Sequence, residues 1–195
     1  MSELEGERAR GGSVASGAVW LVGMMGAGKS TVGPVLARAL GRAFVDTDEA
    51  IVASAGRSIS AIFEHEGEAA FRARERAAMA DAASRAAVVA LGGGAIAQDG
   101  APAWLAERGV VVYLRATPPT LCARVGDAAD RPLLASLSAP ERLARIEALL
   151  AAREPAYATA RVVVDVDGPG ANGDAPQVAA RIAARLRALP DWEDG

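Results

Sequence analysis

One short stretch of the sequence carries the residues best suited to binding phosphate. Residues 23–30 read Gly-Met-Met-Gly-Ala-Gly-Lys-Ser, which fits the phosphate-loop pattern G-x-x-x-x-G-K-[ST]. Lys29 is the only lysine in a chain with 21 lysine and arginine residues. Its ammonium is a compact point charge, whereas a guanidinium is a broad planar fork. We therefore predict a nucleotide site with Lys29 between the β- and γ-phosphates. The residues expected to form it are Gly26, Ala27, Gly28, Lys29, Ser30 and Thr31.

The sequence on either side of this loop supports the prediction over a chance glycine-rich turn. Residues 18–22 form a short apolar run typical of a buried strand, and apolar residues recur at helical spacing after Ser30. A strand, a glycine loop and a helix is the order that the motif needs, because loop N–H groups and the helix N-terminus together bind an anion. The Ser30 hydroxyl is expected to bind Mg²⁺. Pro34 predicts a kink in the helix, at a cost of about 3 kcal/mol where nothing compensates.

Further apolar runs predict the rest of a sheet, at residues 42–45, 87–91, 110–114 and 162–166. They show little polar alternation, as in a parallel sheet covered on both faces. Helical stretches lie between them, which predicts an open, doubly wound α/β sheet. Such sheets bind ligands beyond the carboxyl ends of their strands. The phosphate loop, Asp46-Thr47-Asp48 and Gly92-Gly93-Gly94 each follow a strand, so we expect all of them at one edge.

Two of these clusters allow more than one interpretation. One of Asp46 and Asp48 could reach Mg²⁺ through water while the other accepts hydrogen bonds from a hydroxylated substrate. Acids that merely stabilise a helix N-terminus are an equally good interpretation. The glycine triplet either makes a tight turn or lets a ligand contact the main chain. Three consecutive glycines are more than a turn needs.

Three arginines are candidates for binding anionic groups. Arg72 lies in a predicted helix, where residue type alone favours a surface cation paired with Glu68 or Glu75 at helical spacing. Arg131 lies in a stretch that predicts a mobile lid, and an arginine closing over a transferring phosphoryl group can raise the rate by about 10³ or more. Arg153 ends a helix, where a cation suits the dipole. Taken singly, Arg131 and Arg153 fit structural and functional roles equally well.

Composition limits the class of protein. The 195 residues, 51% of them apolar, suffice for one domain with a hydrophobic core. The net charge of −3 argues against nucleic-acid binding. No apolar run approaches a membrane span, and the first residues lack the apolar core of a signal peptide. The single cysteine, Cys122, suits a reducing compartment. We expect a cytoplasmic protein with a disordered tail at 1–17, one domain at 18–190 and a short tail at 191–195.

Taken together, these blocks resemble the shikimate kinases. The resemblance covers about residues 19–189. It rests on the phosphate loop, the two aspartates, a Phe-Arg-x-x-Glu block at 71–75, the glycine triplet, and Arg-Pro-Leu-Leu at 131–134 followed by Arg153 and Tyr157. It implies a three-layer α/β/α P-loop kinase fold with a five-stranded parallel sheet in the order 2-3-1-4-5. It also implies a substrate-binding helical region at about 46–76 and a mobile lid at about 126–138.

The resemblance implies a reaction and roles on the acceptor side. The γ-phosphate of ATP would pass to the 3-hydroxyl of shikimate, a step towards chorismate and the aromatic amino acids. Asp48 would bind the acceptor hydroxyls and act as base. Arg72 and Arg153 would bind the shikimate carboxylate, which suits the fork geometry of guanidinium. Gly93 and Gly94 would bind a ring hydroxyl through the backbone.

It also implies roles on the nucleotide side. Ser30 and Asp46 would hold Mg²⁺, Asp46 through water. Lys29 and Arg131 would stabilise the transferring phosphoryl group, and Arg131 would also bind the shikimate that accepts it. Arg124 would stack on adenine, and Pro169 would line the same pocket. The partners expected are therefore ATP, Mg²⁺ and shikimate, bound to a monomer.

Two rival functions are considered. A kinase for another small hydroxy acid, such as gluconate, is disfavoured by the Arg72 and Arg153 pair and by the glycine triplet. A regulator that binds nucleotide without catalysis is disfavoured because the chain keeps the loop lysine, both aspartates and Arg131 together.

Overall fold

A five-stranded, all-parallel sheet organises the computed structural model, which describes residues 17–126, 133–134, 137–167 and 174–193. The strands are β1 (Ala18–Val22), β2 (Phe44–Asp46), β3 (Val88–Ala90), β4 (Gly109–Arg115) and β5 (Val162–Asp165). Their order is β2-β3-β1-β4-β5, with every neighbouring pair parallel. The predicted fold class and strand order are therefore confirmed.

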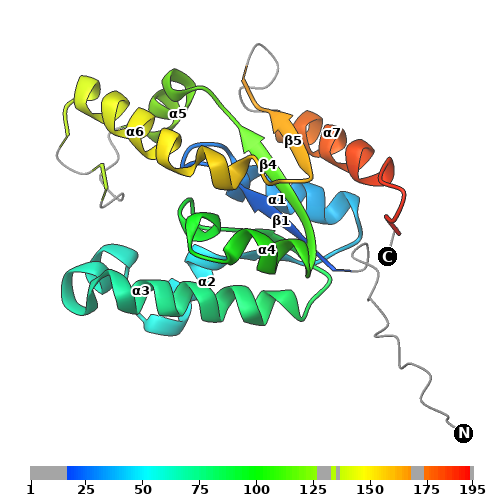
Figure 1. Cartoon of the computed structure of the whole chain (residues 1–195), viewed down its shortest axis with the longest axis horizontal. Coiled ribbons are helices and arrows are strands. Elements are labelled where there is room, and N and C mark those ends of the chain that lie inside the picture. The colour runs from blue at the N-terminus through cyan, green and yellow to red at the C-terminus, as the bar shows by residue number, and fades with distance from the viewer. Residues whose placement is uncertain (1–16, 127–132, 135–136, 168–173, 194–195) are drawn as a thin grey trace, which may run out of the picture.

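Helices cover both faces of this sheet. They are α1 (Lys29–Ala39), α2 (Thr47–Ala55), α3 (Ile59–Ala83), α4 (Ala101–Ala106), α5 (Pro118–Val125), α6 (Ala139–Tyr157) and α7 (Ala175–Arg187), with a short 3₁₀ turn η2 (Ala95–Ala97). Helices α1 and α7 pack against each other on one face, while α4 and α6 lie over the other (Figure 1). In the described ranges, none of the helices combines the length and apolarity that crossing a membrane requires.

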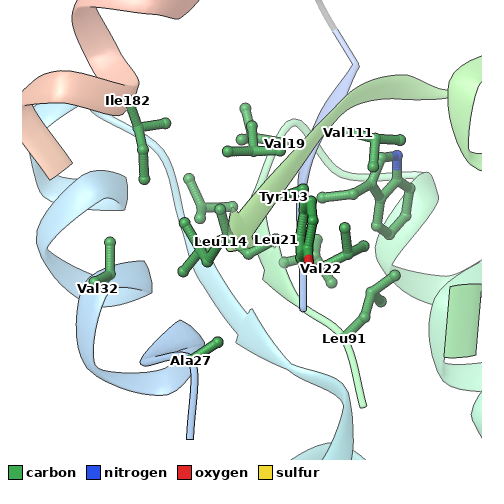
Figure 2. Packing of buried hydrophobic residues seen from close by; sticks show 14 of the residues in the cluster. Val19, Leu21, Val22, Ala27, Val32, Leu91, Val111, Tyr113, Leu114 and Ile182 are labelled. Carbon is green, nitrogen blue, oxygen red and sulfur yellow. The ribbon is translucent and has the colours of Figure 1, made fainter. Parts of the chain in front are cut away.

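The core lies on both sides of the central strands. All five residues of β1 are buried, because β3 and β4 flank it and helices cover it. Side chains of a strand alternate between the two faces. Leu114 of β4 lies towards Val32 of α1 and Ile182 of α7, whereas Val111 and Tyr113 point to the other face (Figure 2). The sheet is therefore a rigid base for the loops at its carboxyl edge.

Pro34 does not end α1, which continues as one helix to Ala39. Proline removes the hydrogen bond that residue 34 would donate to the carbonyl of Ser30. Ser30 and Pro34 both lie on the exposed side of the helix, where water can bind that carbonyl. The opposite side packs tightly, since a Cβ on Gly33 would lie 2.1 Å from a ring carbon of Phe44. The helix therefore stays against β2 despite the proline.

The region between β2 and β3 has a small core of its own. Ile51 of α2 packs with Ile62 and Phe71 of α3, apart from the main core. The sequence predicts a continuous helix here, but Gly67 interrupts α3 with φ 80° and ψ 174°. A positive φ combined with ψ near 180° is a backbone conformation that essentially only glycine adopts. The break sets the direction of the second half of α3, which carries Arg72 and Glu75 to the sheet edge.

Candidate active site

The phosphate loop connects β1 to α1 and encloses its own lysine. Gly26 and Gly28 have φ of 82° and 94°, which residues with a side chain rarely adopt, and Gly28 is the N-cap of α1. The side chain of Lys29 folds back over the loop, where Nζ donates to the carbonyls of Gly23 (2.8 Å) and Met24 (3.1 Å). The ammonium therefore lies beside the N-terminus of α1, where two sources of positive potential favour an anion.

Ser30 and Asp46 lie together beside this loop. Ser30 Oγ donates to Asp46 Oδ2 at 2.6 Å. The other oxygen of Asp46 accepts from the backbone N–H groups of Asp48 (2.9 Å) and Glu49 (3.3 Å), so Asp46 also caps α2. The two interpretations of this aspartate are thus compatible, because one oxygen caps the helix and the other faces Ser30. A hydroxyl next to a carboxylate is the kind of oxygen pair to which Mg²⁺ binds together with phosphates.

Thr47 joins two strand ends, a role that the sequence analysis missed. Its side chain is fully buried. Oγ1 donates to the carbonyl of Ala90 and accepts from the N–H of Gly92, both at 3.2 Å. The threonine therefore fixes the start of the glycine triplet relative to Asp46 and Asp48. Its position between two acids gives no pattern from which this contact could have been predicted.

Gly92 leaves room for two carboxyl groups. A Cβ at this position would lie 2.6 Å from Oε1 of Glu75 and 2.8 Å from Oδ1 of Asp48. Glu75 is only 1% exposed, and its other oxygen accepts from Arg72 and Gln98, both at 2.8 Å. Burial raises the pKa of the Glu75 carboxyl, Arg72 opposes this rise, and the charge of Asp48 adds to it. Gln98 is thus a further site residue that the sequence analysis did not name. Glu75, expected there only as an ion-pair partner of Arg72, is another.

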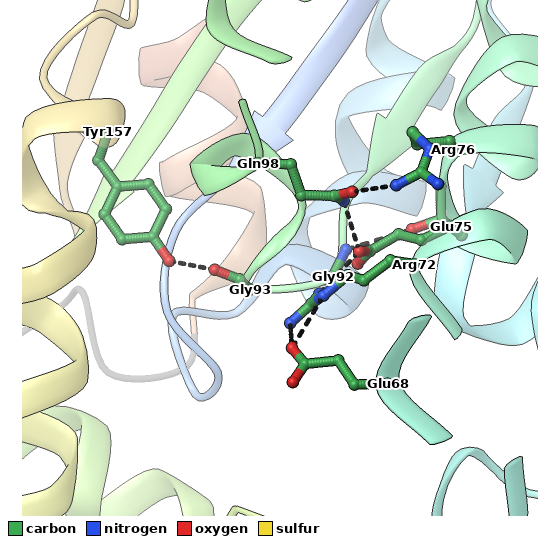
Figure 3. Close-up of polar contacts among 9 residues, drawn as sticks. Glu68, Arg72, Glu75, Arg76, Gly92, Gly93, Gln98 and Tyr157 are labelled. Atoms are coloured by element: carbon green, nitrogen blue, oxygen red, sulfur yellow. Dashed lines mark hydrogen bonds and ion pairs between the residues drawn. The ribbon is translucent and has the colours of Figure 1, made fainter. Parts of the chain in front are cut away.

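Arg72 and Arg153 converge on the last glycine of the triplet. A Cβ on Gly94 would lie 3.1 Å from Arg72 Nη1 and 3.5 Å from Arg153 Nη2. Arg72 also pairs with Glu75 (2.8 Å) and Glu68 (3.0 Å), so the predicted helical ion pairs do form (Figure 3). Burial disfavours the charge of Arg72, but these acids outweigh it and raise the pKa of the guanidinium.

Arg153 reaches Gly94 from a different helix than Arg72. It belongs to α6 and is 9% exposed, with Nη1 3.6 Å from the sulfur of Met24 in the phosphate loop. One guanidinium from α3 and one from α6 therefore meet at the main chain that follows β3. Two forks at one point suit a bidentate anion such as a carboxylate.

A cleft of about 980 Å³ extends from the phosphate loop to Gly93, and the arginine pair lies beside it, since a Cβ on Gly93 would be 3.6 Å from Arg153 Nη1. Its walls include residues 25–32, Asp46, Asp48 and Gly93. Arg124 lines its outer part and donates to the carbonyls of Val166 (2.7 Å) and Gly26 (3.5 Å). The structure thus places Lys29, Ser30, Asp46, Asp48, Gly93 and Arg124 along the cleft. Arg72, Gly94 and Arg153 lie next to its Gly93 wall. Arg131 and Pro169 lie outside the described residues, as do most of the predicted lid and residues 1–16 of the predicted tail.

A sheet of this order, whose first strand leads into a phosphate loop, defines the class of P-loop kinases. The comparisons with known proteins identify the family within this class. The family model described as shikimate kinase matches residues 25–187. The chain therefore belongs to the shikimate kinase family.

Individual relatives agree with this assignment. The chain is 48% identical over 158 residues to a shikimate kinase of Salinibacter ruber, covering 77% of this chain and 78% of the relative. It is 47% identical over 173 residues to that of Halorhodospira halophila, covering 88% and 94%. A solved shikimate kinase from Acinetobacter baumannii in complex with shikimate matches with a TM-score of 0.81 at 36% identity, covering 88% of this chain and 93% of that one.

Proposed function

We propose that this protein transfers the γ-phosphate of ATP to the 3-hydroxyl of shikimate, giving shikimate 3-phosphate and ADP. The observation that carries the proposal is the convergence of Arg72 and Arg153 at Gly94, next to Gly93, which lines the same cleft as the phosphate loop. Shikimate is a carboxylate on a ring that carries hydroxyl groups. Two guanidinium groups beside the cleft and a phosphate site within it match the carboxylate of the acceptor and the phosphates of the donor.

On the acceptor side, the arginine pair binds the carboxylate and sets the direction of the ring. Asp48 lines the same cleft as the phosphate loop and lies beside Gly92. We assign to it the binding of the ring hydroxyls and the acceptance of the proton from the attacking one. Gly93 and Gly94 bring bare main chain to the substrate, because no Cβ separates the ligand from their peptide groups.

On the nucleotide side, we assign the phosphates to residues 26–31. The ammonium of Lys29 is held by two loop carbonyls, and its flexible stem lets it turn towards the β- and γ-phosphates. Ser30 Oγ and Asp46 Oδ2, 2.6 Å apart, fit a Mg²⁺ site. Mg²⁺ neutralises charge on the β- and γ-phosphates when it is bound. Arg124 and Pro169 are assigned to adenine, and Arg131 to the transferring phosphoryl group.

The reaction then needs little covalent help from the protein. The substrate oxygen forms a bond to the γ-phosphorus, the bond from that phosphorus to the β–γ bridging oxygen breaks, and the hydroxyl proton goes to Asp48. Holding both reactants in one cleft supplies most of the rate enhancement, since it makes the encounter effectively unimolecular. The cationic groups stabilise the charge of the transition state.

A coupled assay of ADP release tests the proposal. With ATP and Mg²⁺, we expect turnover with shikimate and at most weak turnover with gluconate. Preference for gluconate would favour the rival kinase, and no ADP with either acceptor would favour the non-catalytic regulator. We also propose a cytoplasmic monomer, for which the mass in gel filtration should be close to 19.8 kDa.

A further inference from the structure

Tyr157 connects the arginine-bearing helix to the glycine triplet. It lies one helical turn after Arg153 at the end of α6, and its side chain is fully buried. Its hydroxyl donates to the carbonyl of Gly93 at 2.5 Å (Figure 3). The bond joins residues 64 positions apart in the chain, so it fixes one wall of the cleft relative to another.

The direction of this bond determines where the next N–H group points. The peptide between Gly93 and Gly94 is trans, as are all peptide bonds in the described part of the chain. In a trans peptide, the C=O and N–H groups point in opposite directions. With the Gly93 carbonyl held on Tyr157, the N–H of Gly94 faces away from the tyrosine. Glycines on both sides would otherwise let this peptide rotate easily.

The tyrosine itself is held firmly. Its ring stacks on Tyr113 of β4, with centroids 4.8 Å apart and planes at 17°. The Tyr113 hydroxyl donates in turn to Glu154 Oε2 at 2.9 Å. Burial raises the pKa of Tyr157 to about 12, and the cation of Arg153 only partly opposes this. The hydroxyl therefore keeps its proton, and remains a donor, at neutral pH.

We propose that Tyr157 is a positioning residue of the acceptor site, which fixes the Gly93–Gly94 peptide so that its N–H meets the substrate while Arg153 stays beside Gly94. It does not touch the substrate itself and acts through the main chain of the triplet. The inference rests on the proposed function, because it assigns the triplet to the acceptor. Tyr113 provides a matched control, since it belongs to the same ring stack but donates to Glu154 instead.

The test compares Tyr157→Phe with Tyr113→Phe. Each variant loses one hydroxyl and one hydrogen bond. The bond of Tyr113 has a charged acceptor, so Tyr113→Phe should lower the Tm at least as much as Tyr157→Phe. Only Tyr157→Phe should raise the KM for shikimate, by about 3- to 10-fold from the loss of its hydrogen bond, with the KM for ATP changed less than about 2-fold. An equal shift in shikimate KM in both variants, or an unchanged KM in Tyr157→Phe, would overturn the proposal.

A second measurement does not depend on turnover. The amide resonance of Gly94 should move in Tyr157→Phe and stay in place in Tyr113→Phe, without any ligand. If the wild-type protein fails to phosphorylate shikimate, the proposed function is wrong, whereas this shift still tests the positioning of the peptide. If Tyr157→Phe does not fold, the proposal is tested on the wild-type protein instead. Its Gly94 amide resonance should shift when shikimate is added, and an unchanged resonance would contradict the proposal.

Discussion

Replacing Gly92 by alanine should damage both the fold and the catalytic centre, because the new methyl group would occupy space that two carboxyl groups use. It would lie 2.6 Å from Glu75 Oε1 and 2.8 Å from Asp48 Oδ1. Carbon contacts are most favourable at about 3.5–4.0 Å, so one or both side chains must move. Gly92 does not have a positive φ, so the backbone itself tolerates alanine and the effect comes from the clash.

The expected size follows from how firmly the two acids are held. Overpacking a tight site costs about 1–3 kcal/mol. Because Arg72 and Gln98 hydrogen-bond to Glu75, its side chain cannot move away easily, and we expect a destabilisation in the upper half of this range. For a chain of this length, about 2–3 kcal/mol corresponds to a fall in Tm of roughly 4–12 °C. Displacing Asp48 by about 1 Å should lower kcat by about 10²-fold.

Thermal unfolding and steady-state kinetics measure these two effects. Gly93→Ala is the control for stability, because its Cβ would come no closer than 3.4 Å to any atom and should lower the Tm much less. A Gly92→Ala variant with the wild-type Tm would show that the carboxyl groups are not packed against Gly92. A Gly92→Ala variant with a lowered Tm but a normal kcat would contradict the role of Asp48 as the base.

Three further predictions address other parts of the site. Arg72→Ala should raise the KM for shikimate at least about 10-fold, since a charged hydrogen bond contributes about 1.5–3 kcal/mol, with little effect on the KM for ATP. Arg74→Ala is the control, because Arg74 pairs with Glu66 instead. An equal loss of affinity for both ligands by calorimetry would contradict the carboxylate assignment. Lys29→Met should abolish ADP release while circular dichroism stays unchanged, and retained turnover would reject its role. Stability should fall as pH rises above 10, since the pKa of Tyr157 is about 12 in the folded protein and its ordinary value is 10.0. By pH 11 the ionisation of Tyr157 should lower the free energy of unfolding by about 1.4 kcal/mol, which urea unfolding can measure. The total decrease between pH 10 and pH 11 should therefore be smaller in Tyr157→Phe than in the wild type. An equal decrease in both proteins would refute the assignment.

The features that the sequence predicted well are local ones. The strands appear as apolar runs, and the phosphate loop is a contiguous motif whose backbone conformation follows from its own glycines. The ion pairs of Arg72 follow from helical spacing alone. The break of α3 at Gly67 was not predicted, because an isolated glycine is tolerated in a helical pattern and gives no sign of its dihedral angles.

The missed site residues depend on contacts between distant segments. Glu75 looks like an ordinary surface acid until α3 packs against η2, where its carboxyl group becomes buried against Gly92. Thr47 acquires a role only when β2 and β3 lie side by side. Because Thr47 and Glu75 both meet the triplet only at the sheet edge, a change at the triplet should disturb these residues on one side of it and the residues of α6 on the other. The glycine triplet is therefore the structural centre of the acceptor site, since Thr47, Asp48, Glu75, Arg72, Arg153 and Tyr157 all contact it or lie against it.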